Sequence, residues 1–376
     1  MKISRIEVFQ VDLPFAGGVY TLSGGRSYES FDATIVRVAT ECGLEGWGES
    51  TPFGATYIAA HGRGVRAGIE EMAPTLIGLD PRKTDRLNDA MDAALVGHLH
   101  AKTPIDVACW DIFGKSVGMP VCDLLGGRVE GRVPVISSIH VEPPEAMRES
   151  VARHRAQGFL GHSIKVGAAE AEGGPALDAE RIAACLADRE PGEWYLVDAN
   201  GGLSVEHALR MLGQLPSGLD FVLEAPCATW RETVSLRRRC KAPILWDELA
   251  QTEADIAQLI AEDAADGIGL KISKQGGLTR TRRQRDLCSA AGLVMSVQET
   301  TGSEIAFAAI VHMAQSVPTR LLRCALDTRS VIAKSTARFD APVEKGGVVA
   351  PEGPGLGLEI DRSVLGAPVA VYGEGD

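Results

Sequence analysis

Short apolar runs alternate with amphipathic segments through the middle and the C-terminal part of the chain. Eight such runs follow Gly126 and Gly127, at residues 133–139, 161–166, 195–197, 221–223, 244–246, 267–272, 293–297 and 321–326. Most of the segments between them have the length and the apolar spacing of helices that pack on one face. Eight buried strands joined mainly by helices predict an α/β protein with a parallel, TIM-like barrel.

The N-terminal part has a different pattern. Polar and apolar residues alternate from Met1 to about Glu49, which predicts a small antiparallel sheet. Residues 104–115 then repeat apolar positions at helical spacing, and Gly118 with Pro120 provides a stop signal. We therefore expect an α+β capping domain at 1–127, a barrel at 128–345, and a segment at 346–376 that returns to the capping domain.

Two long connections in the N-terminal part are candidates for functional loops. Residues 15–31 are rich in Gly and Ser, and residues 51–64 form a second long connection. Both are longer than an ordinary hairpin turn, and long loops in compact domains often cover a binding site.

Composition and charge narrow the class of protein. The chain has 376 residues, of which 45% are hydrophobic and 23% charged, as expected for a globular protein with a sizeable core. A net charge of −12 disfavours nucleic acid and anionic membranes as partners. Eight scattered cysteines without a CxxC motif indicate a reducing compartment, and no apolar run reaches the roughly 18 residues of a membrane span. We expect a cytoplasmic protein.

Charged residues end five of the predicted barrel strands. They are Lys165, Asp198, Glu224, Asp247 and Lys271, and their positions differ by 33, 26, 23 and 24 residues, each close to one strand-helix unit. Strand C-terminal ends meet at one mouth of such a barrel. A single charged residue there is more often a helix cap or a surface ion pair. Five in successive units indicate a shared site.

The residue types in this set suggest their chemistry. Asp198, Glu224 and Asp247 would repel one another unless a cation lay between them, and a hard divalent ion prefers oxygen ligands. We therefore expect one Mg²⁺ per chain, with Asn200 and Glu248 as polar neighbours of its ligands. The two lysines flank the carboxylates, so they are candidates for acid and base on opposite sides of a substrate.

The motifs SIK (163–165), VDAN (197–200), LEAP (223–226), WDE (246–248) and LKISKQGGL (270–278) resemble those of the enolase superfamily, in its muconate-lactonizing and mandelate racemase-like branch. The resemblance extends over nearly the whole chain. It implies an N-terminal α+β capping domain, a (β/α)7β barrel, Mg²⁺ on the three carboxylates, and acid/base lysines at 165 and 271. It also implies proton removal beside a substrate carboxylate, a small-molecule substrate, and a homo-oligomer, usually a dimer or an octamer.

One departure narrows the activity that the resemblance implies. The branch commonly has Lys-x-Lys on the second barrel strand, whereas Ser163 takes the first position here, which argues against muconate cycloisomerases and ordinary dipeptide epimerases. Residues 20–26, 56–57, 61–62, 162–165 and 353–357 are similar to those of cis-3-hydroxy-L-proline dehydratases and hydroxyproline betaine 2-epimerases. Lys165 is our candidate base and Lys271 our candidate acid for the dehydration to Δ1-pyrroline-2-carboxylate.

The substrates of these two activities differ in the number of carbon substituents on the nitrogen atom. A quaternary betaine favours an aromatic cage, but the last barrel strand offers no aromatic residue, whereas Glu299 could accept a hydrogen bond from a secondary ammonium. Further candidate substrate contacts are Tyr20, Tyr57, Ser163 and Asp327. Epimerisation of a proline derivative remains the main alternative. A sugar-acid dehydratase lacks support because no late-strand His-Asp pair is present, and an inactive barrel that only binds a ligand is the alternative of another class.

Overall fold

The computed structural model describes residues 1–22 and 25–373, so Ser23 and Gly24 of the first candidate loop lie outside the described residues. The N-terminal part is a four-stranded antiparallel sheet in the order β17-β1-β4-β5. These strands are β1 (Ile3–Pro14), β4 (Ser30–Thr40), β5 (Glu45–Ser50) and β17 (Ala370–Gly373). The C-terminal segment thus returns to the sheet, with Val8 paired to Ala370 and Arg5 to Gly373.

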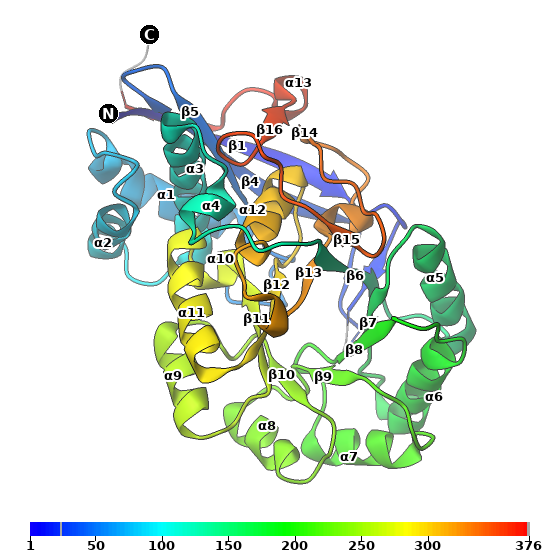
Figure 1. Ribbon diagram of the computed structural model, residues 1–376. Helices are drawn as coiled ribbons and strands as arrows, with labels where there is room; N and C mark the ends of the chain where they lie inside the picture. The colour runs from blue at the N-terminus through cyan, green and yellow to red at the C-terminus, as the bar shows by residue number, and fades with distance from the viewer. Residues whose placement is uncertain (23–24, 374–376) are drawn as a thin grey trace.

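Helices α1 (Gly62–Leu76) and α3 (Leu99–Val117) pack on this sheet, and α2 (Thr84–Ala94) packs against both of them (Figure 1). Strand β5 lies directly on α3, because a Cβ atom at Gly46 or Gly48 would stand 2.1 Å from a carbonyl oxygen of α3. Helix α3 begins five residues before the expected 104–115 segment and contains Pro104. It ends as predicted, with Gly118 in the left-handed region at a φ of 71°.

The first long connection contains a short hairpin of β2 (Tyr20–Thr21) and β3 (Ser27–Tyr28), in which Tyr20 pairs with Tyr28. The alternation of residue types did not reveal these strands, because each has only two residues.

Eight parallel strands form a closed barrel, in which the last strand pairs with the first through Ala325 and Val135. The strands are β6 (Val133–Ile139), β7 (Gly161–Lys165), β8 (Trp194–Asp198), β9 (Val222–Glu224), β10 (Ile244–Trp246), β11 (Gly267–Lys271), β12 (Val294–Gln298) and β13 (Leu322–Leu326). All eight lie where the apolar runs predicted them.

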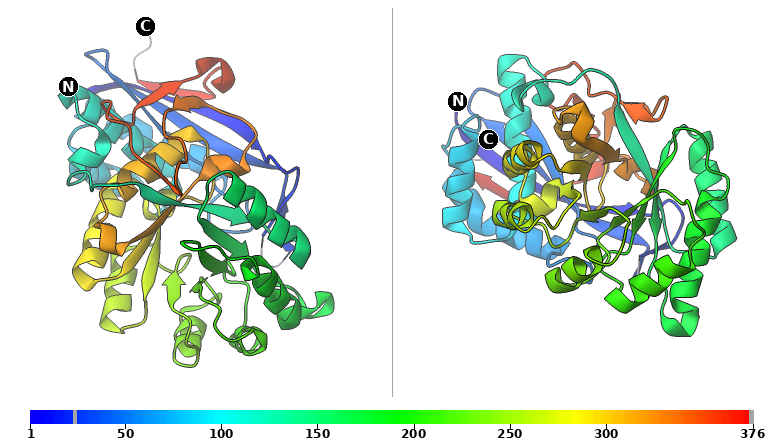
Figure 2. Two further views of the ribbon diagram at one scale, coloured as in Figure 1. Left: turned by 45° about the vertical axis from the view of Figure 1, so that its right-hand side comes forward. Right: turned by 60° about the horizontal axis from the view of Figure 1, so that its bottom comes forward.

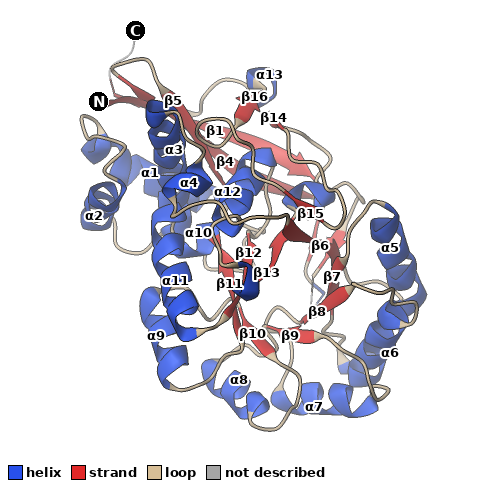
Figure 3. Ribbon diagram, viewed as in Figure 1, coloured by secondary structure: helices blue, strands red, loops and turns tan. Residues whose placement is uncertain are grey.

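Seven of the eight strands are followed by a helix that packs outside the barrel (Figures 1 and 3). These helices are α5 (Pro144–Ala156), α6 (Gly174–Leu186), α7 (Val205–Gln214), α8 (Trp230–Arg237), α9 (Glu253–Ala261), α11 (Leu278–Ala291) and α12 (Glu304–Ala314). The one-turn helix α10 (Ile272–Gln275) precedes α11, and only the short η4 (Thr328–Val331) follows β13. The (β/α)7β barrel with an N-terminal cap is confirmed, whereas the exact domain limits stay a prediction.

The remaining elements connect the barrel back to the cap. They are α4 (Val121–Leu124), β14 (Ala337–Phe339), β15 (Gly347–Val348), β16 (Leu358–Ile360) and α13 (Arg362–Leu365). Strand β14 pairs with β16, and β15 pairs with the first barrel strand. In both views of Figure 2 the strands of the cap lie on one side of the barrel. No helix in the described part of the chain is long and apolar enough to cross a membrane.

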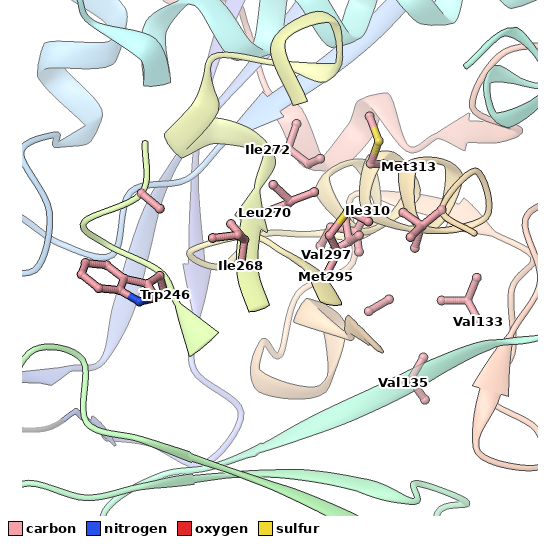
Figure 4. Packing of buried hydrophobic residues seen from close by; sticks show 14 of the residues in the cluster. Val133, Val135, Trp246, Ile268, Leu270, Ile272, Met295, Val297, Ile310 and Met313 are labelled. Carbon is pink, nitrogen blue, oxygen red and sulfur yellow. The ribbon is translucent and has the colours of Figure 1, made fainter. Parts of the chain in front are cut away.

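Residues of each barrel strand alternate between two apolar layers because successive side chains point to opposite faces. Residues such as Val135, Ile268 and Val297 pack outward against the helices in the main core (Figure 4). Ile136, Leu196, Leu245 and Cys324 form a separate small cluster. Since they alternate with the outward-packing residues, they fill the barrel interior.

A buried hydrogen-bond network joins the cap to the barrel. Asp106 of α3 accepts hydrogen bonds from Asn88 Nδ2 of α2 at 2.6 Å, from Thr279 Oγ1 of α11 at 2.6 Å and from the Thr279 backbone N–H at 3.0 Å. Trp110 Nε1 donates to the same Thr279 hydroxyl at 2.8 Å. A fully buried carboxylate is costly without such partners. The network therefore fixes the cap helices α2 and α3 against α11.

Candidate active site

The inward-pointing residue at the end of each central barrel strand is polar. Asp198 follows Leu196 by two positions, and Asp247 follows Leu245 in the same way, so both share the inward direction of the interior cluster. The same spacing relates Lys165 to Ser163 and Lys271 to Gly269. The alternation that builds the barrel interior therefore also directs these side chains toward one mouth.

One cavity of about 40 Å³ lies at this mouth, beneath the cap. Four of the five predicted acid, base and metal residues line it: Lys165, Asp198, Glu224 and Lys271. The fifth, Asp247, is buried beside the cavity and forms an ion pair with Lys271. The structure thus brings four of the five groups into one pocket and places the fifth directly beside it.

Lys165 forms an ion pair with Asp198 on the next strand. Burial alone would lower the pKa of Lys165, but the adjacent carboxylate of Asp198 outweighs it, so the pKa lies above the ordinary lysine value. Asn200 supports the carboxylate from the other side, with its backbone N–H 2.8 Å from Asp198 Oδ1 and its Nδ2 3.0 Å from Oδ2.

Lys271 is paired more extensively. It contacts Asp247 and donates to Tyr57 Oη at 2.8 Å. Burial would lower its pKa, but the negative charges around it, led by Asp247, hold the pKa well above the ordinary value. Lys274 of α10 contacts the same carboxylate, with its Nζ 2.8 Å from Asp247 Oδ1. Burial opposes ionisation of Asp247, but the two lysines lower its pKa to about 2.

Glu224 lies between the other two carboxylates on β9. Burial, followed by the charges of Asp198 and Asp247, raises the pKa of Glu224 to about 8. Its Oε1 accepts a hydrogen bond of 2.8 Å from Gln298 Nε2. A pKa raised in this way indicates that the clustered carboxylates repel one another and that a nearby positive charge would stabilise their ionised forms.

These three carboxylates suit Mg²⁺, which binds hard oxygen ligands. Among the described residues no three His, Cys, Asp or Glu side chains converge as a finished metal site. Lys165 holds one oxygen of Asp198, and Lys271 and Lys274 hold those of Asp247. The three carboxylates are suitable ligands for a divalent cation. In this conformation the lysines balance the negative charge of Asp198 and Asp247.

Glu299 also lines the cavity, just beyond the end of β12. It accepts hydrogen bonds from the Ser273 backbone N–H at 2.7 Å, from Ser273 Oγ at 2.8 Å and from the Thr300 backbone N–H at 3.1 Å. Burial nevertheless raises its pKa to about 8. These contacts fix the Glu299 carboxyl to the segments that follow β11 and β12.

Both cap loops reach the barrel mouth through tyrosines. Tyr57 Oη donates to Glu248 on the loop after β10, and Asn200 Nδ2 donates to both Tyr57 Oη at 3.3 Å and Glu248 Oε1 at 3.2 Å. Tyr20 Oη lies 2.6 Å from Ser138 Oγ at the end of β6. The predicted substrate contacts Tyr20 and Tyr57 therefore line the cavity while they tie the cap to the barrel.

The other two predicted contacts lie on or just after β7 and β13, the two strands that flank β6 in the barrel. Ser163 lines the cavity on β7, two residues before Lys165. Asp327 also lines it, but its carboxylate accepts hydrogen bonds from the Arg329 guanidinium at 2.8 Å and 3.0 Å. Because Arg329 already balances this charge, Asp327 is a weaker acceptor for a substrate cation than Glu299.

Sequence reasoning missed two residues that position the carboxylates, Lys274 and Gln298. Lys274 lies three residues after Lys271, which places it about one helical turn away in α10. Gln298 ends β12 with the inward direction of its strand, two residues after Ser296. The alternation of inward and outward side chains along β12 would have revealed Gln298. No pattern in the sequence indicates that Lys274 contacts Asp247.

Comparisons with known proteins agree with this geometry. The family model described as "Enolase C-terminal domain-like" matches residues 146–364, and the "Mandelate racemase / muconate lactonizing enzyme, N-terminal domain" matches residues 17–126. A cis-3-hydroxy-L-proline dehydratase of Roseibium aggregatum is 41% identical over 99% of this chain and 100% of its own length. An N-succinyl-L-Arg/Lys racemase of Bacillus cereus is 28% identical over 97% of each chain.

A solved structure from Roseovarius nubinhibens ISM, of a mandelate racemase/muconate lactonizing enzyme complexed with magnesium, is 63% identical to this chain. It has a TM-score of 0.98 and covers 99% of this chain and 100% of its own. Members of the superfamily bind Mg²⁺ and remove a proton beside a carboxylate. The chain therefore belongs to the mandelate racemase/muconate lactonizing enzyme family of the enolase superfamily.

Proposed function

We propose that the protein dehydrates cis-3-hydroxy-L-proline to Δ1-pyrroline-2-carboxylate. The observation that carries the proposal is the pair of buried lysines, Lys165 on β7 and Lys271 on β11, with three carboxylates on the strands between them. The 41% identity to a cis-3-hydroxy-L-proline dehydratase supports the choice of substrate.

The stereochemistry of this substrate suits two lysines on opposite sides. In cis-3-hydroxy-L-proline the hydroxyl and the carboxylate share one ring face, so the α-hydrogen lies on the face opposite the leaving hydroxyl. Lys165 Nζ removes the α-proton, the C–H electron pair forms the C2–C3 double bond, and the C3–O bond breaks. Lys271 gives its proton to the departing oxygen, which leaves as water, and the enamine product tautomerises to Δ1-pyrroline-2-carboxylate.

The partners of the two lysines support this division of roles. Lys271 contacts both a carboxylate and the Tyr57 hydroxyl, which favour its protonated form, whereas among the described residues Lys165 contacts Asp198 alone. When bound, Mg²⁺ would offset the carboxylate charge that keeps these pKa values high and would supply positive charge to the substrate carboxylate. Asp198, Glu224 and Asp247 would hold it.

The ring nitrogen would lie near Glu299. A secondary ammonium ion has two N–H donors, and Glu299 is a buried carboxyl on the cavity wall. Ionisation of Glu299 beside this cation would be favourable despite its burial.

Epimerisation of a proline derivative or of hydroxyproline betaine is the second candidate. It would use the same lysines, one to remove the α-proton and one to return a proton from the other face. Tyr20, Phe53 and Tyr57 line the cavity, and aromatic rings can contact a quaternary ammonium. An inactive barrel that only binds a ligand is disfavoured because all five charged groups are in place.

Incubation with cis-3-hydroxy-L-proline and Mg²⁺ in D₂O, followed by NMR, tests the proposal. We expect loss of water and formation of Δ1-pyrroline-2-carboxylate, and no reaction after chelation of the metal. A Ser289→Ala variant, altered on α11 outside the site, is the matched control and should retain the activity. Deuterium at the α-carbon with inverted configuration and no loss of water would refute the dehydration and support the epimerase.

A further inference from the structure

Two buried hydroxyl groups of the cavity wall have no hydrogen-bond partner among the residues that the structure describes. Thr301 and Thr328 are each 1% exposed and both line the cavity. Their Oγ1 atoms are buried and make no hydrogen bond within the part of the chain that the structure describes. A buried hydroxyl without a partner costs free energy. Such groups beside a cavity indicate that a ligand supplies the missing partner.

Four other hydroxyls of the same cavity already have hydrogen-bond partners in the protein: those of Tyr20, Ser138, Tyr57 and Thr300. Tyr20 and Ser138 contact each other, Tyr57 donates to Glu248, and Thr300 Oγ1 donates to the Thr51 carbonyl at 2.6 Å. The two threonines therefore differ from these neighbours in having hydrogen-bonding capacity left for a bound molecule.

Their place in the barrel indicates which part of a substrate they would meet. Thr301 lies three residues beyond β12, and Thr328 lies two residues beyond β13. Strand β13 is four positions from β9 in the closed ring of eight, so it lies opposite the strand that carries Glu224. A substrate with its carboxylate at the three acidic residues would extend its ring toward the two threonines.

The rest of this wall offers few competing polar groups. Ile136, Leu326 and Val331 line the cavity beside the threonines, and the carboxylate of Asp327 is paired with Arg329. Glu299, at the end of the neighbouring strand, is the acidic group that remains for a cation. The wall therefore combines apolar surface for ring carbons with two hydroxyl acceptors for the two N–H groups and one carboxyl that can balance the positive charge.

We infer that the hydroxyls of Thr301 and Thr328 accept hydrogen bonds from the ring N–H groups of the substrate, beside the carboxyl of Glu299. The inference deepens the proposed function and rests on it. It defines the substrate class as cyclic secondary amino acids with a free NH₂⁺ group. A quaternary nitrogen has no N–H to donate and would leave both hydroxyls unpaired, so the two threonines select against betaines.

The test compares two ligands of the Mg²⁺-loaded protein. L-Proline has the ring nitrogen but no hydroxyl to lose, and cyclopentanecarboxylate has the same ring size with carbon in place of nitrogen. Titration calorimetry measures both dissociation constants in wild type, in Thr301→Val and in Thr328→Val, which keep the side-chain shape. We expect each variant to bind L-proline roughly 10-fold more weakly, the effect of one hydrogen bond to a charged group. Its affinity for cyclopentanecarboxylate should not fall.

Two sets of variants control for changes in packing. Thr301→Ser and Thr328→Ser retain the hydroxyl and should keep the wild-type preference for L-proline. Ser289 on α11 carries another buried hydroxyl without a partner among the described residues, but it does not line the cavity. Ser289→Ala should therefore leave both affinities unchanged.

The possible outcomes separate the inference from the proposed function. If the valine variants bind both ligands more weakly by the same factor, the threonines only shape the pocket and the inference is overturned. Unchanged affinities for both ligands would overturn it too. Failure of the wild type to bind L-proline would also overturn it. Wild-type protein that releases no water from cis-3-hydroxy-L-proline would defeat the dehydratase proposal, while the ratio of the two affinities still decides the role of the threonines.

Discussion

Removing the hydroxyl of Tyr57 should loosen the cap without changing the acid, the base or the carboxylates. Tyr57 Oη joins the second cap loop to Glu248 and accepts a hydrogen bond from Lys271 at 2.8 Å. The Tyr57 oxygen also accepts a hydrogen bond from Asn200 Nδ2 at 3.3 Å, and Tyr57→Phe removes all three contacts. The ring itself stays, with its packing against Phe53 at a centroid distance of 6.0 Å and with Lys271 5.2 Å from its centre.

The size of the effect follows from the partners that are lost. A hydrogen bond to a charged group contributes about 1.5–3 kcal/mol. Glu248 would then keep only the contact from Asn200 at 3.2 Å, since its Oε2 has no partner among the described residues. Because Tyr57 is only partly buried, we take a value in the lower part of this range, about 2 kcal/mol, as the stabilisation of the closed state by the Tyr57 hydroxyl. This corresponds to a loss of about 30-fold in kcat/KM.

Steady-state kinetics and hydrogen exchange test this prediction together. We expect the loss in kcat/KM together with faster amide exchange at residues 51–61, because a weaker contact leaves the loop open more often. Tyr28→Phe is the matched control: the Tyr28 hydroxyl contacts Thr56 within the cap at 2.9 Å and does not reach the barrel. A loss below threefold in Tyr57→Phe, or unchanged exchange in the loop, would refute the reasoning.

Three further predictions concern the charged groups. Lys165→Ala and Lys271→Ala should each abolish α-proton exchange in D₂O while circular dichroism stays that of wild type; retained exchange in both would contradict the two-lysine mechanism. Mg²⁺ at 100 times its Kd should stabilise the protein by about 2.7 kcal/mol, and Glu224→Ala should largely remove this gain in melting experiments. Because burial raises the pKa of Glu299 to about 8 from 4.5, the folded state holds a proton that the unfolded state releases, so stability falls as pH rises between these values. Glu299→Gln should flatten the fall in melting temperature over that range, and an unchanged pH profile would contradict it.

The barrel could be predicted from the sequence because its strands are short, apolar and evenly spaced. The run 244–246 coincides with Ile244–Trp246, and the charged residue after it has the inward direction that strand alternation gives. Spacing and parity are local properties, so they locate Lys165, Asp198, Glu224, Asp247 and Lys271 without knowledge of tertiary contacts. The same reasoning identified Asn200 and Glu248, which contact each other and Tyr57.

Contacts that depend on the exact course of loops and short helices could not be predicted in this way. The pairing of Asp327 with Arg329 depends on how η4 folds, and the contact of Lys274 with Asp247 depends on the one-turn helix after β11. The early start of α3 at Leu99 was also missed, because Pro104 read as a helix beginning although it lies inside the helix. The satisfied hydroxyls of the cavity depend on cap residues such as Thr51, more than two hundred positions away.

The pairing of β17 with β1 makes the cap a discontinuous folding unit. Residues 370–373 hydrogen-bond to residues 5–8, so the edge strand of this sheet comes from the far end of the chain. During translation the ribosome completes all eight barrel strands before that edge strand is synthesised. The same proximity makes the protein a good candidate for circular permutation, with a short linker from residue 373 to residue 1 and new termini in an exposed barrel loop.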